Sequence, residues 1–343
     1  MKHIEISKRI FHFKQPAGTS RGIYTTRQSY FLTLTDDGMP GIKGVGECAP
    51  LPKLSCDDLP DYETILHQIC KLVESTDKIP YALLRPYPSI LFGLETAFAQ
   101  LKAYGSTMLF DTPFGRGEEG IRINGLVWMG SFDEMAERLE TKLRQGFHCV
   151  KLKIGAIDFE KEIELIRHIR ESFDKHQVEL RVDANGAFTP KNALQHLETL
   201  AKYDIHSIEQ PIKQHQWDDM AHLCAASPLP IALDEELIGV NVAAMKEALL
   251  DTIRPQYIVL KPSLHGGMRG TEEWIRLAHA RGIGSWITSA LESNIGLNAI
   301  AQLCAKLYGP RVSTPQGLGT GQLFTDNITM PLTIRGDEMW ITQ

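Results

Sequence analysis

Residues 149–154 read Cys-Val-Lys-Leu-Lys-Ile, an alternation of polar and apolar side chains that is typical of a β-strand. In an extended chain Lys151 and Lys153 lie on one face, and the apolar side chains that alternate with them lie on the other. An exposed edge strand can also carry a row of lysines. A closed barrel has no edge, so in a barrel both ammonium groups would face the interior.

The sequence on both sides of this stretch alternates short apolar runs with longer amphipathic segments. The expected strands lie near residues 122–128, 149–154, 180–184, 206–209, 231–234, 257–261, 285–289 and 311–314. The expected helices lie near residues 131–146, 158–176, 190–203, 215–226, 240–250, 269–281 and 295–307. Eight such strands over roughly 200 residues, with no dinucleotide-binding fingerprint after the first strand, favour a (β/α)8 barrel over a doubly wound sheet.

Two further segments flank the predicted barrel, which we place at residues 111–315. Residues 1–110 are expected to form a smaller α+β domain, with strands near 2–12, 28–35 and 42–47 and helices near 57–74 and 87–104. Residues 316–343 look strand-like and are expected to return to this N-terminal domain.

Single carboxylates end three successive expected strands, at Asp183, Glu209 and Asp234. Their separations are 26 and 25 residues, one strand–helix unit each. Because the carboxyl ends of barrel strands meet at one rim, the three acids should converge there. Converging carboxylates repel one another unless a cation lies among them. Three hard oxygen ligands suit Mg2+, with Mn2+ able to substitute.

A lysine, Lys261, ends the next expected strand, one unit after Asp234. A substrate carboxylate at the metal would then have Lys153 on one side and Lys261 on the other. Such a site can stabilise the enediolate that forms when a carbon next to a carboxylate loses its proton. A lysine beside a cation and a second lysine should have a lowered pKa and can act as the base. Lys151, one pleat deeper, is expected to orient the carboxylate.

The chain resembles the enolase superfamily, specifically its muconate-lactonising subgroup, in Lys151-x-Lys153, Asp183-Ala184-Asn185, Glu209-Gln210-Pro211, Asp234-Glu235 and Lys261. The resemblance covers nearly the whole chain, because residues 44–50 are similar to the family's segment that leads into a substrate-covering loop. It implies an N-terminal capping domain, a Mg2+ site and a small-molecule carboxylate substrate. Asn185 and Glu235 are expected to support the metal ligands from behind.

Within the subgroup the sequence is most similar to the o-succinylbenzoate synthase family of menaquinone biosynthesis, in residues 261–267 and 288–293. This resemblance implies a Mg2+-dependent syn dehydration of 2-succinyl-6-hydroxy-2,4-cyclohexadiene-1-carboxylate to 2-succinylbenzoate, the reaction of a carbon–oxygen lyase. Lys153 would take the proton and then protonate the leaving hydroxide, while Lys261 would support the intermediate from the opposite face. The candidates for holding the substrate are Arg181, Thr288, Ser289 and Gly317, although a turn cap explains the two hydroxyls equally well.

Other activities on the same scaffold stay open at this point. An N-succinylamino acid racemase or a dipeptide epimerase would use lysines on both faces of the substrate. Dipeptide epimerases resemble one another in an Asp-x-Asp after the eighth strand, and residues 316–320 read Gln-Gly-Leu-Gly-Thr here. The missing acids count against an ammonium-bearing substrate but not against an N-succinylated one. A noncatalytic barrel should lack a ligand or a lysine, and none is missing.

The composition bears on partners and location. With 36 Lys and Arg against 42 Asp and Glu, the net charge of -6 argues against a nucleic-acid partner. The sequence shows no apolar run of about 18 residues, so we expect no membrane span. The first residues alternate in polarity, unlike a signal peptide, and we expect a cytoplasmic protein with six reduced cysteines. The sequence does not predict the oligomeric state.

Overall fold

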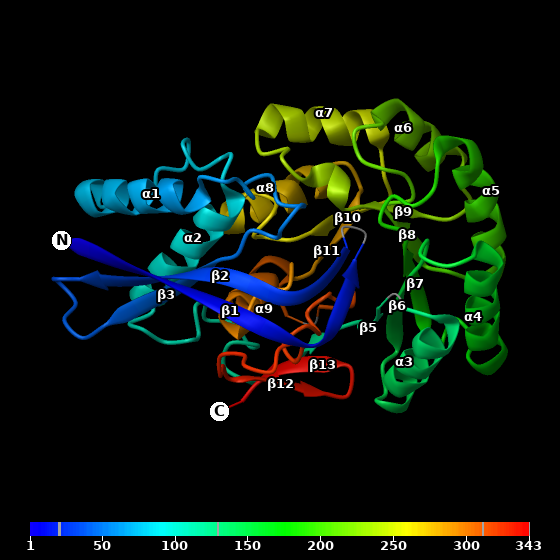
Figure 1. The fold of residues 1–343 in the computed structure, drawn as a ribbon, viewed down its shortest axis with the longest axis horizontal. Coiled ribbons are helices and arrows are strands. Elements are labelled where there is room, and N and C mark those ends of the chain that lie inside the picture. The colour runs from blue at the N-terminus through cyan, green and yellow to red at the C-terminus, as the bar shows by residue number, and fades with distance from the viewer. Residues whose placement is uncertain (20–21, 129, 311, 343) are drawn as a thin grey trace.

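A three-stranded antiparallel sheet in the order β1-β2-β3 begins the fold, and the helices α1 and α2 pack beside it (Figure 1). The computed structural model describes residues 1–19, 22–128, 130–310 and 312–342. The elements of this part are β1 (Lys2–Thr19), β2 (Gly22–Asp36), β3 (Lys43–Cys48), α1 (Tyr62–Thr76) and α2 (Pro88–Lys102).

Close contact between β3 and α2 explains the glycines of the 44–50 segment. A Cβ atom at Gly46 would lie 1.8 Å from the Gly93 carbonyl oxygen, and one at Gly44 would lie 1.9 Å from the Ala97 carbonyl oxygen. Only glycine allows the strand and the helix to approach so closely.

The β1–β2 hairpin is longer than the sequence predicted. The expected strands end near residue 12 and resume near residue 28, whereas β1 continues to Thr19 and β2 begins at Gly22. The extension is stabilised by a distant segment, since the Lys14 backbone N–H donates to the Leu323 carbonyl at 2.8 Å and Phe13 pairs with Phe324. Local sequence does not reveal such a partner.

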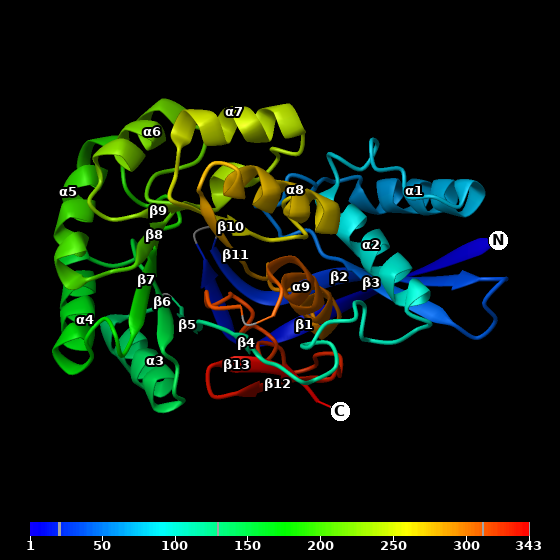
Figure 2. The ribbon, with the colours of Figure 1, turned by 180° about the vertical axis from the view of Figure 1, so that it is seen from behind.

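Seven parallel strands form the next sheet, in the order β11-β10-β9-β8-β7-β6-β5. The strands are β5 (Gly125–Val127), β6 (Cys149–Lys153), β7 (Glu179–Asp183), β8 (Ser207–Glu209), β9 (Ile231–Leu233), β10 (Tyr257–Leu260) and β11 (Gly284–Ile287). The helices are α3 (Phe132–Arg144), α4 (Phe159–Ser172), α5 (Pro190–Leu200), α6 (Trp217–Ala226), α7 (Ala243–Ile253), α8 (Gly267–His279) and α9 (Asn294–Tyr308), with 3-10 turns η1 (Ala201–Tyr203) and η2 (Glu235–Leu237). Figures 1 and 2 show α3 to α7 outside the strands and α8 and α9 on the side of the N-terminal sheet.

The gap between β11 and the first barrel strand is bridged by Gln316 and Gly317. Gln316 pairs in parallel with Ile123, and Gly317 pairs in parallel with Thr288. The predicted strand near 311–314 is therefore misplaced, and its first residue, Arg311, lies outside the described residues. Pro315 lacks a backbone N–H, so the ladder can begin only after it. The α/β barrel class is confirmed, with its eighth strand reduced to two bridging residues.

The chain after Gly317 returns across the molecule without forming an eighth barrel helix. Residues 323–325 bond to β1, and β12 (Leu332–Arg335) and β13 (Glu338–Ile341) join β4 (Ile121–Arg122) in the order β12-β13-β4. The C-terminal segment therefore contacts both the N-terminal sheet and the start of the barrel. The division of the chain into domains at residues 1–110, 111–315 and 316–343 remains a prediction.

Among the helices of the described residues, none has the length and apolar character that a bilayer crossing requires. All six cysteines are free thiols, five of them buried.

Candidate active site

The inward face of β6 carries both lysines of residues 149–154. Val150 and Leu152 are fully buried in the core between strands and helices. Lys151 and Lys153 therefore face the barrel interior, as the alternation predicted, and their side chains are each 11% exposed.

The two lysines form ion pairs with the acids on the neighbouring strands. Lys151 Nζ lies 3.0 Å from Asp183 Oδ2 and 3.0 Å from both carboxylate oxygens of Glu209. Lys153 Nζ lies 2.7 Å from Asp183 Oδ2 and 2.7 Å from Asn185 Oδ1. The structure thus brings these five predicted site residues into one network.

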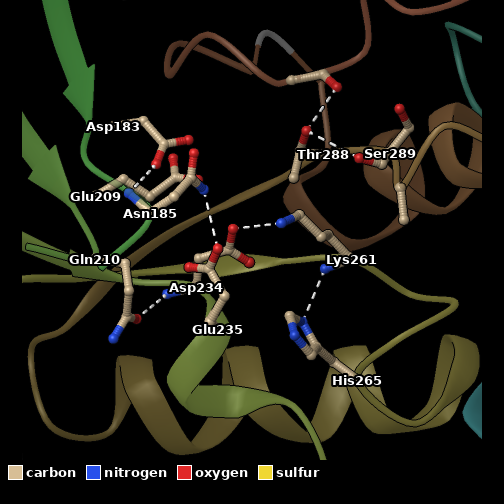
Figure 3. A network of polar contacts seen from close by, with 12 residues as sticks. Asp183, Asn185, Glu209, Gln210, Asp234, Glu235, Lys261, His265, Thr288 and Ser289 are labelled. Carbon is tan, nitrogen blue, oxygen red and sulfur yellow. Dashed lines mark hydrogen bonds and ion pairs between the residues drawn. The ribbon is translucent and has the colours of Figure 1, made fainter. Parts of the chain in front are cut away.

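Lys261 and Asp234 form a second ion pair across the site (Figure 3). Asn185 Nδ2 donates to Glu235 Oε1 at 2.9 Å and so links this pair to the first network. Among the described residues, Asp234 Oδ1 and Glu235 Oε2 are buried without a hydrogen-bond partner. A buried carboxylate oxygen without a partner is costly, and a cation would satisfy it.

The electrostatics also favour a cation at this rim. Burial raises the pKa of Glu209 well above its ordinary value, and the charges of Asp183 and Asp234 add to this effect against the attraction of Lys151. Burial also acts to raise the pKa of Asp183, but Lys151 and Lys153 outweigh it and hold that pKa below its ordinary value. Within the described residues the acids pair with lysines and form no compact three-ligand cluster.

Two of the lysines face mainly carboxylates, whereas the lowered pKa expected from the sequence concerned a lysine beside a bound cation and stays a prediction. Burial acts to lower the pKa of Lys151 and of Lys261. For Lys151 the charges of Asp183 and Glu209 outweigh burial, and for Lys261 those of Asp234 and Glu235 do so. The pKa of both ammonium groups is raised, because each faces more carboxylates than lysines.

Two buried side chains for which the sequence predicted no role, Gln210 and His265, organise this rim. Gln210, with φ of 41°, turns the chain directly after Glu209, and its Oε1 accepts from the Asp234 backbone N–H at 3.1 Å. His265 Nδ1 accepts from the Lys261 backbone N–H at 2.9 Å (Figure 3). The sequence could have pointed to His265 only through its position, since it is a polar residue four positions after Lys261.

A cavity lies above the lysines and is enclosed by residues from both ends of the chain. Its apolar walls are Tyr24, Leu51, Leu54, Leu126, Trp128, Ala290 and Leu291. Its polar walls include Asn124, Thr288, Ser289 and Thr320. The structure therefore places Thr288, Ser289 and Gly317 at the cavity, where Thr288 Oγ1 donates to the Gly317 carbonyl at 2.9 Å. A Cβ at Gly317 would lie 2.2 Å from that hydroxyl, so a larger residue does not fit.

Arg181, which we expected to hold substrate, does not line this cavity. Its side chain is one pleat below Asp183 and is 2% exposed. Its Nε lies 2.7 Å from Glu179 Oε1, its Nη1 donates to the Pro315 carbonyl at 3.0 Å, and its guanidinium stacks on Trp286. A guanidinium so fully engaged inside the barrel is a structural group.

A buried arginine, Arg27 on β2, joins the two loops that meet above the cavity. Its guanidinium donates to the Ala49 carbonyl at 2.6 Å and to the Leu291 carbonyl at 3.2 Å, and it is 1% exposed. One loop belongs to the N-terminal part and leads to Leu51, while the other follows β11. Arg27 therefore holds together two walls of the cavity.

We expect Arg27→Met to lower the free energy of unfolding by about 3 kcal/mol, because buried carbonyls would lose a charged donor. We also expect KM to rise more than kcat falls, since the loop walls loosen while the lysines stay in place. Urea denaturation and steady-state kinetics measure both effects. Lys14→Met, at an exposed position of β1, is the control, and equal stability of the two variants would contradict the role of Arg27.

The fold and the site define a class of protein, an α/β-barrel enzyme with acids and lysines at the carboxyl ends of its strands. The family described as enolase C-terminal domain-like matches residues 134–339, and the chain belongs to this family. It is 48% identical to the o-succinylbenzoate synthase of Desulfotalea psychrophila (strain LSv54 / DSM 12343), over 94% of this chain and 95% of that one. The crystal structure of MenC from Desulfotalea psychrophila LSv54 is similar over 99% of both chains, with 43% identity and a TM-score of 0.83.

A relative with another activity is also similar. The L-Ala-D/L-Glu epimerase of Bacillus subtilis (strain 168) is 27% identical over 88% of this chain and 84% of its own. The structure of its substrate-liganded complex matches with a TM-score of 0.83, over 99% of this chain and 95% of that one, at 23% identity. At 23% identity this structural match indicates a shared fold and no more.

Proposed function

We propose that the chain is an o-succinylbenzoate synthase of menaquinone biosynthesis, a carbon–oxygen lyase. It converts 2-succinyl-6-hydroxy-2,4-cyclohexadiene-1-carboxylate to 2-succinylbenzoate and water. The observation that carries this proposal is the 48% identity to an o-succinylbenzoate synthase over nearly the whole of both chains. The reaction uses a small carboxylate, and we expect neither nucleic acid nor membrane as a partner and a cytoplasmic location.

Lys153 is the base in this proposal. Its amine takes the proton from the carbon next to the substrate carboxylate, and its ammonium form then returns that proton to the hydroxyl that leaves from the same face. One C–H bond and one C–O bond break, water departs, and the ring becomes aromatic. Asp183 and Asn185, each 2.7 Å from Lys153 Nζ, hold the side chain in place.

Asp183, Glu209 and Asp234 are the residues that would hold the metal. The donor set is all carboxylate, and the unpartnered Asp234 Oδ1 is a free ligand position. When bound, Mg2+ supplies positive charge where the substrate carboxylate gains electrons, and Mn2+ would substitute. Lys151, bonded to both Asp183 and Glu209, keeps these two acids in register. Asn185 supports the ligand Asp183, since its backbone N–H donates to Asp183 Oδ1 at 3.1 Å, and Glu235 in turn holds the Asn185 amide.

Lys261 supplies charge on the face opposite Lys153. Its ammonium group, paired with Asp234, stabilises the enediolate without moving a proton. The apolar walls at Leu51, Trp128 and Leu291 suit a cyclohexadiene ring. The hydroxyls of Thr288 and Ser289, together with Gly317, suit the polar succinyl arm.

A substrate panel tests the proposed reaction. We expect kcat/KM for the cyclohexadiene acid to exceed that for an Ala-Glu dipeptide by at least about 100-fold, because an ammonium group in this cavity would face three lysines, Lys151, Lys153 and Lys261, against a single acid of the described wall, Glu235. Steady-state kinetics with both substrates and with an N-succinylamino acid measure the ratio. A dipeptide turned over best would overturn the reaction, while the family and the lysine positions would stand.

An N-succinylamino acid racemase is the second candidate, since Lys153 and Lys261 both line the cavity. Racemisation needs proton transfer on both faces, whereas dehydration needs it on one. We therefore expect Lys261→Arg to retain a measurable fraction of dehydration and to lose racemisation. Exchange into deuterated water with the N-succinylamino acid follows the second reaction. Equal loss of both activities would contradict the division of roles between the lysines.

A further inference from the structure

A second cavity lies away from the active site, where the loop between α1 and α2 meets α7 and α8. Its volume is about 280 Å3, and its walls include Tyr81, Arg85, Asn241, Lys246, Arg269 and Glu273. The helices α2 and α8 lie side by side in both ribbon views (Figures 1 and 2). The walls thus come from the N-terminal part and from the barrel.

Three cationic side chains line this cavity against one acid. Lys246 is 1% exposed, and its Nζ lies 2.8 Å from Glu273 Oε2 and 3.1 Å from the Gly270 carbonyl oxygen. Arg85 and Arg269 are exposed. Within the described part of the chain neither guanidinium forms an ion pair, although Arg269 stacks on the Tyr81 ring at 4.8 Å. The cavity therefore carries an excess of two positive charges.

Two acids near Arg269 are engaged by other groups, since Glu273 pairs with Lys246 and Glu95 accepts from backbone N–H groups. Glu95 Oε1 accepts from the Arg269 backbone N–H at 3.1 Å, and Glu95 Oε2 accepts from the Met268 backbone N–H. Glu95 thereby caps the start of α8, and it is 7% exposed. Asn241 Oδ1, also in the cavity wall, is buried and has no partner among the described residues.

The positive charges of Lys246 and Arg85 lie close enough to disfavour each other. Burial lowers the pKa of Lys246, and the charge of Arg85 lowers it further against the attraction of Glu273. A chain with a net charge of -6 has ample acids with which to neutralise such a cluster. Two guanidinium groups without an acidic partner among the described residues, Arg85 and Arg269, lie in the wall of one cavity. Such a pair is suited to bind an oxyanion, because each guanidinium offers two parallel N–H donors.

We propose that this cavity is a binding site for a small oxyanion with two negative charges, which joins the 81–85 loop to α8. Arg85 and Arg269 hold the charged oxygens from two sides, and Lys246 adds charge from below. Inorganic phosphate and a dicarboxylate share the two negative charges and differ in the spacing of those charges. With hydrogenphosphate as the ligand, Asn241 Oδ1 also accepts from the protonated oxygen. The proposal does not depend on the reaction assigned to the active site.

Titration calorimetry with inorganic phosphate, and separately with succinate, tests the site at constant ionic strength set by sodium chloride. We expect saturable binding of one probe or both, which tells a compact oxyanion from an extended dicarboxylate. Arg85→Gln and Arg269→Gln should each weaken it about tenfold. Arg276→Gln, at an exposed position of α8 outside the cavity wall, should leave it unchanged.

The active site also attracts anions, so Lys153→Ala is the second control and should bind the probes as the wild type does. Loss of binding in Lys153→Ala would assign the anion to the active site and overturn the proposal. Affinity unchanged by Arg85→Gln and Arg269→Gln, or no saturable binding of either probe, would overturn it as well. Both arginines are exposed, so their replacement leaves the fold intact, and circular dichroism checks this.

Discussion

Lys153→Arg is expected to lower kcat for the dehydration by about 10⁴-fold, because the base and the acid of the reaction are the same amine. A guanidinium keeps the positive charge but cannot release a proton at ordinary pH. The ion pair with Asp183, 2.7 Å away in the native protein, can still form, so the fold should be retained. Single-turnover kinetics measure the loss in the chemical step.

Lys151→Arg is the matched comparison on the same strand and the same face. Lys151 bonds to Asp183 and Glu209 and takes no part in proton transfer in our proposal. A guanidinium can also bond to both acids, so this variant should keep more activity than Lys153→Arg. The reverse order of the two variants would exchange the roles that we assign to these lysines.

Asp234→Asn is expected to weaken Mg2+ binding by at least about 100-fold and to remove most turnover. The amide removes one negative charge from the ligand set and leaves the neighbouring Lys261 without its ion pair. Calorimetry with Mg2+ measures the affinity, and kcat at saturating Mg2+ shows what remains. The fold should survive, since the Asp234 backbone keeps its bond to Gln210.

Lys261→Arg separates the two effects of that substitution. It preserves the charge that faces Asp234 and should therefore bind Mg2+ as tightly as the wild type. Wild-type Mg2+ affinity in Asp234→Asn would remove Asp234 from the ligand set. A chelator should likewise abolish turnover by the wild type, and added Mg2+ or Mn2+ should restore it.

The alternation of single strands predicted much of the fold and the inward face of the site. Apolar residues such as Val150 and Leu152 must meet the helices, so Lys151 and Lys153 must face inward, and this follows from neighbours two positions apart. The same reasoning brought Asp183, Glu209 and Asp234 to one rim, because parallel strands end together.

Only the tertiary structure decided which groups those side chains meet. Arg181 has the same local pattern as Asp183, yet one pleat of depth engages it with Glu179 and Pro315 inside the barrel. Arg27 lies in an ordinary strand, and its importance depends on the carbonyls of Ala49 and Leu291, 22 and 264 residues away. The hydrophobic periodicity of a strand predicts the face on which each residue lies. The contacts of that residue depend on packing between segments that are far apart in the sequence.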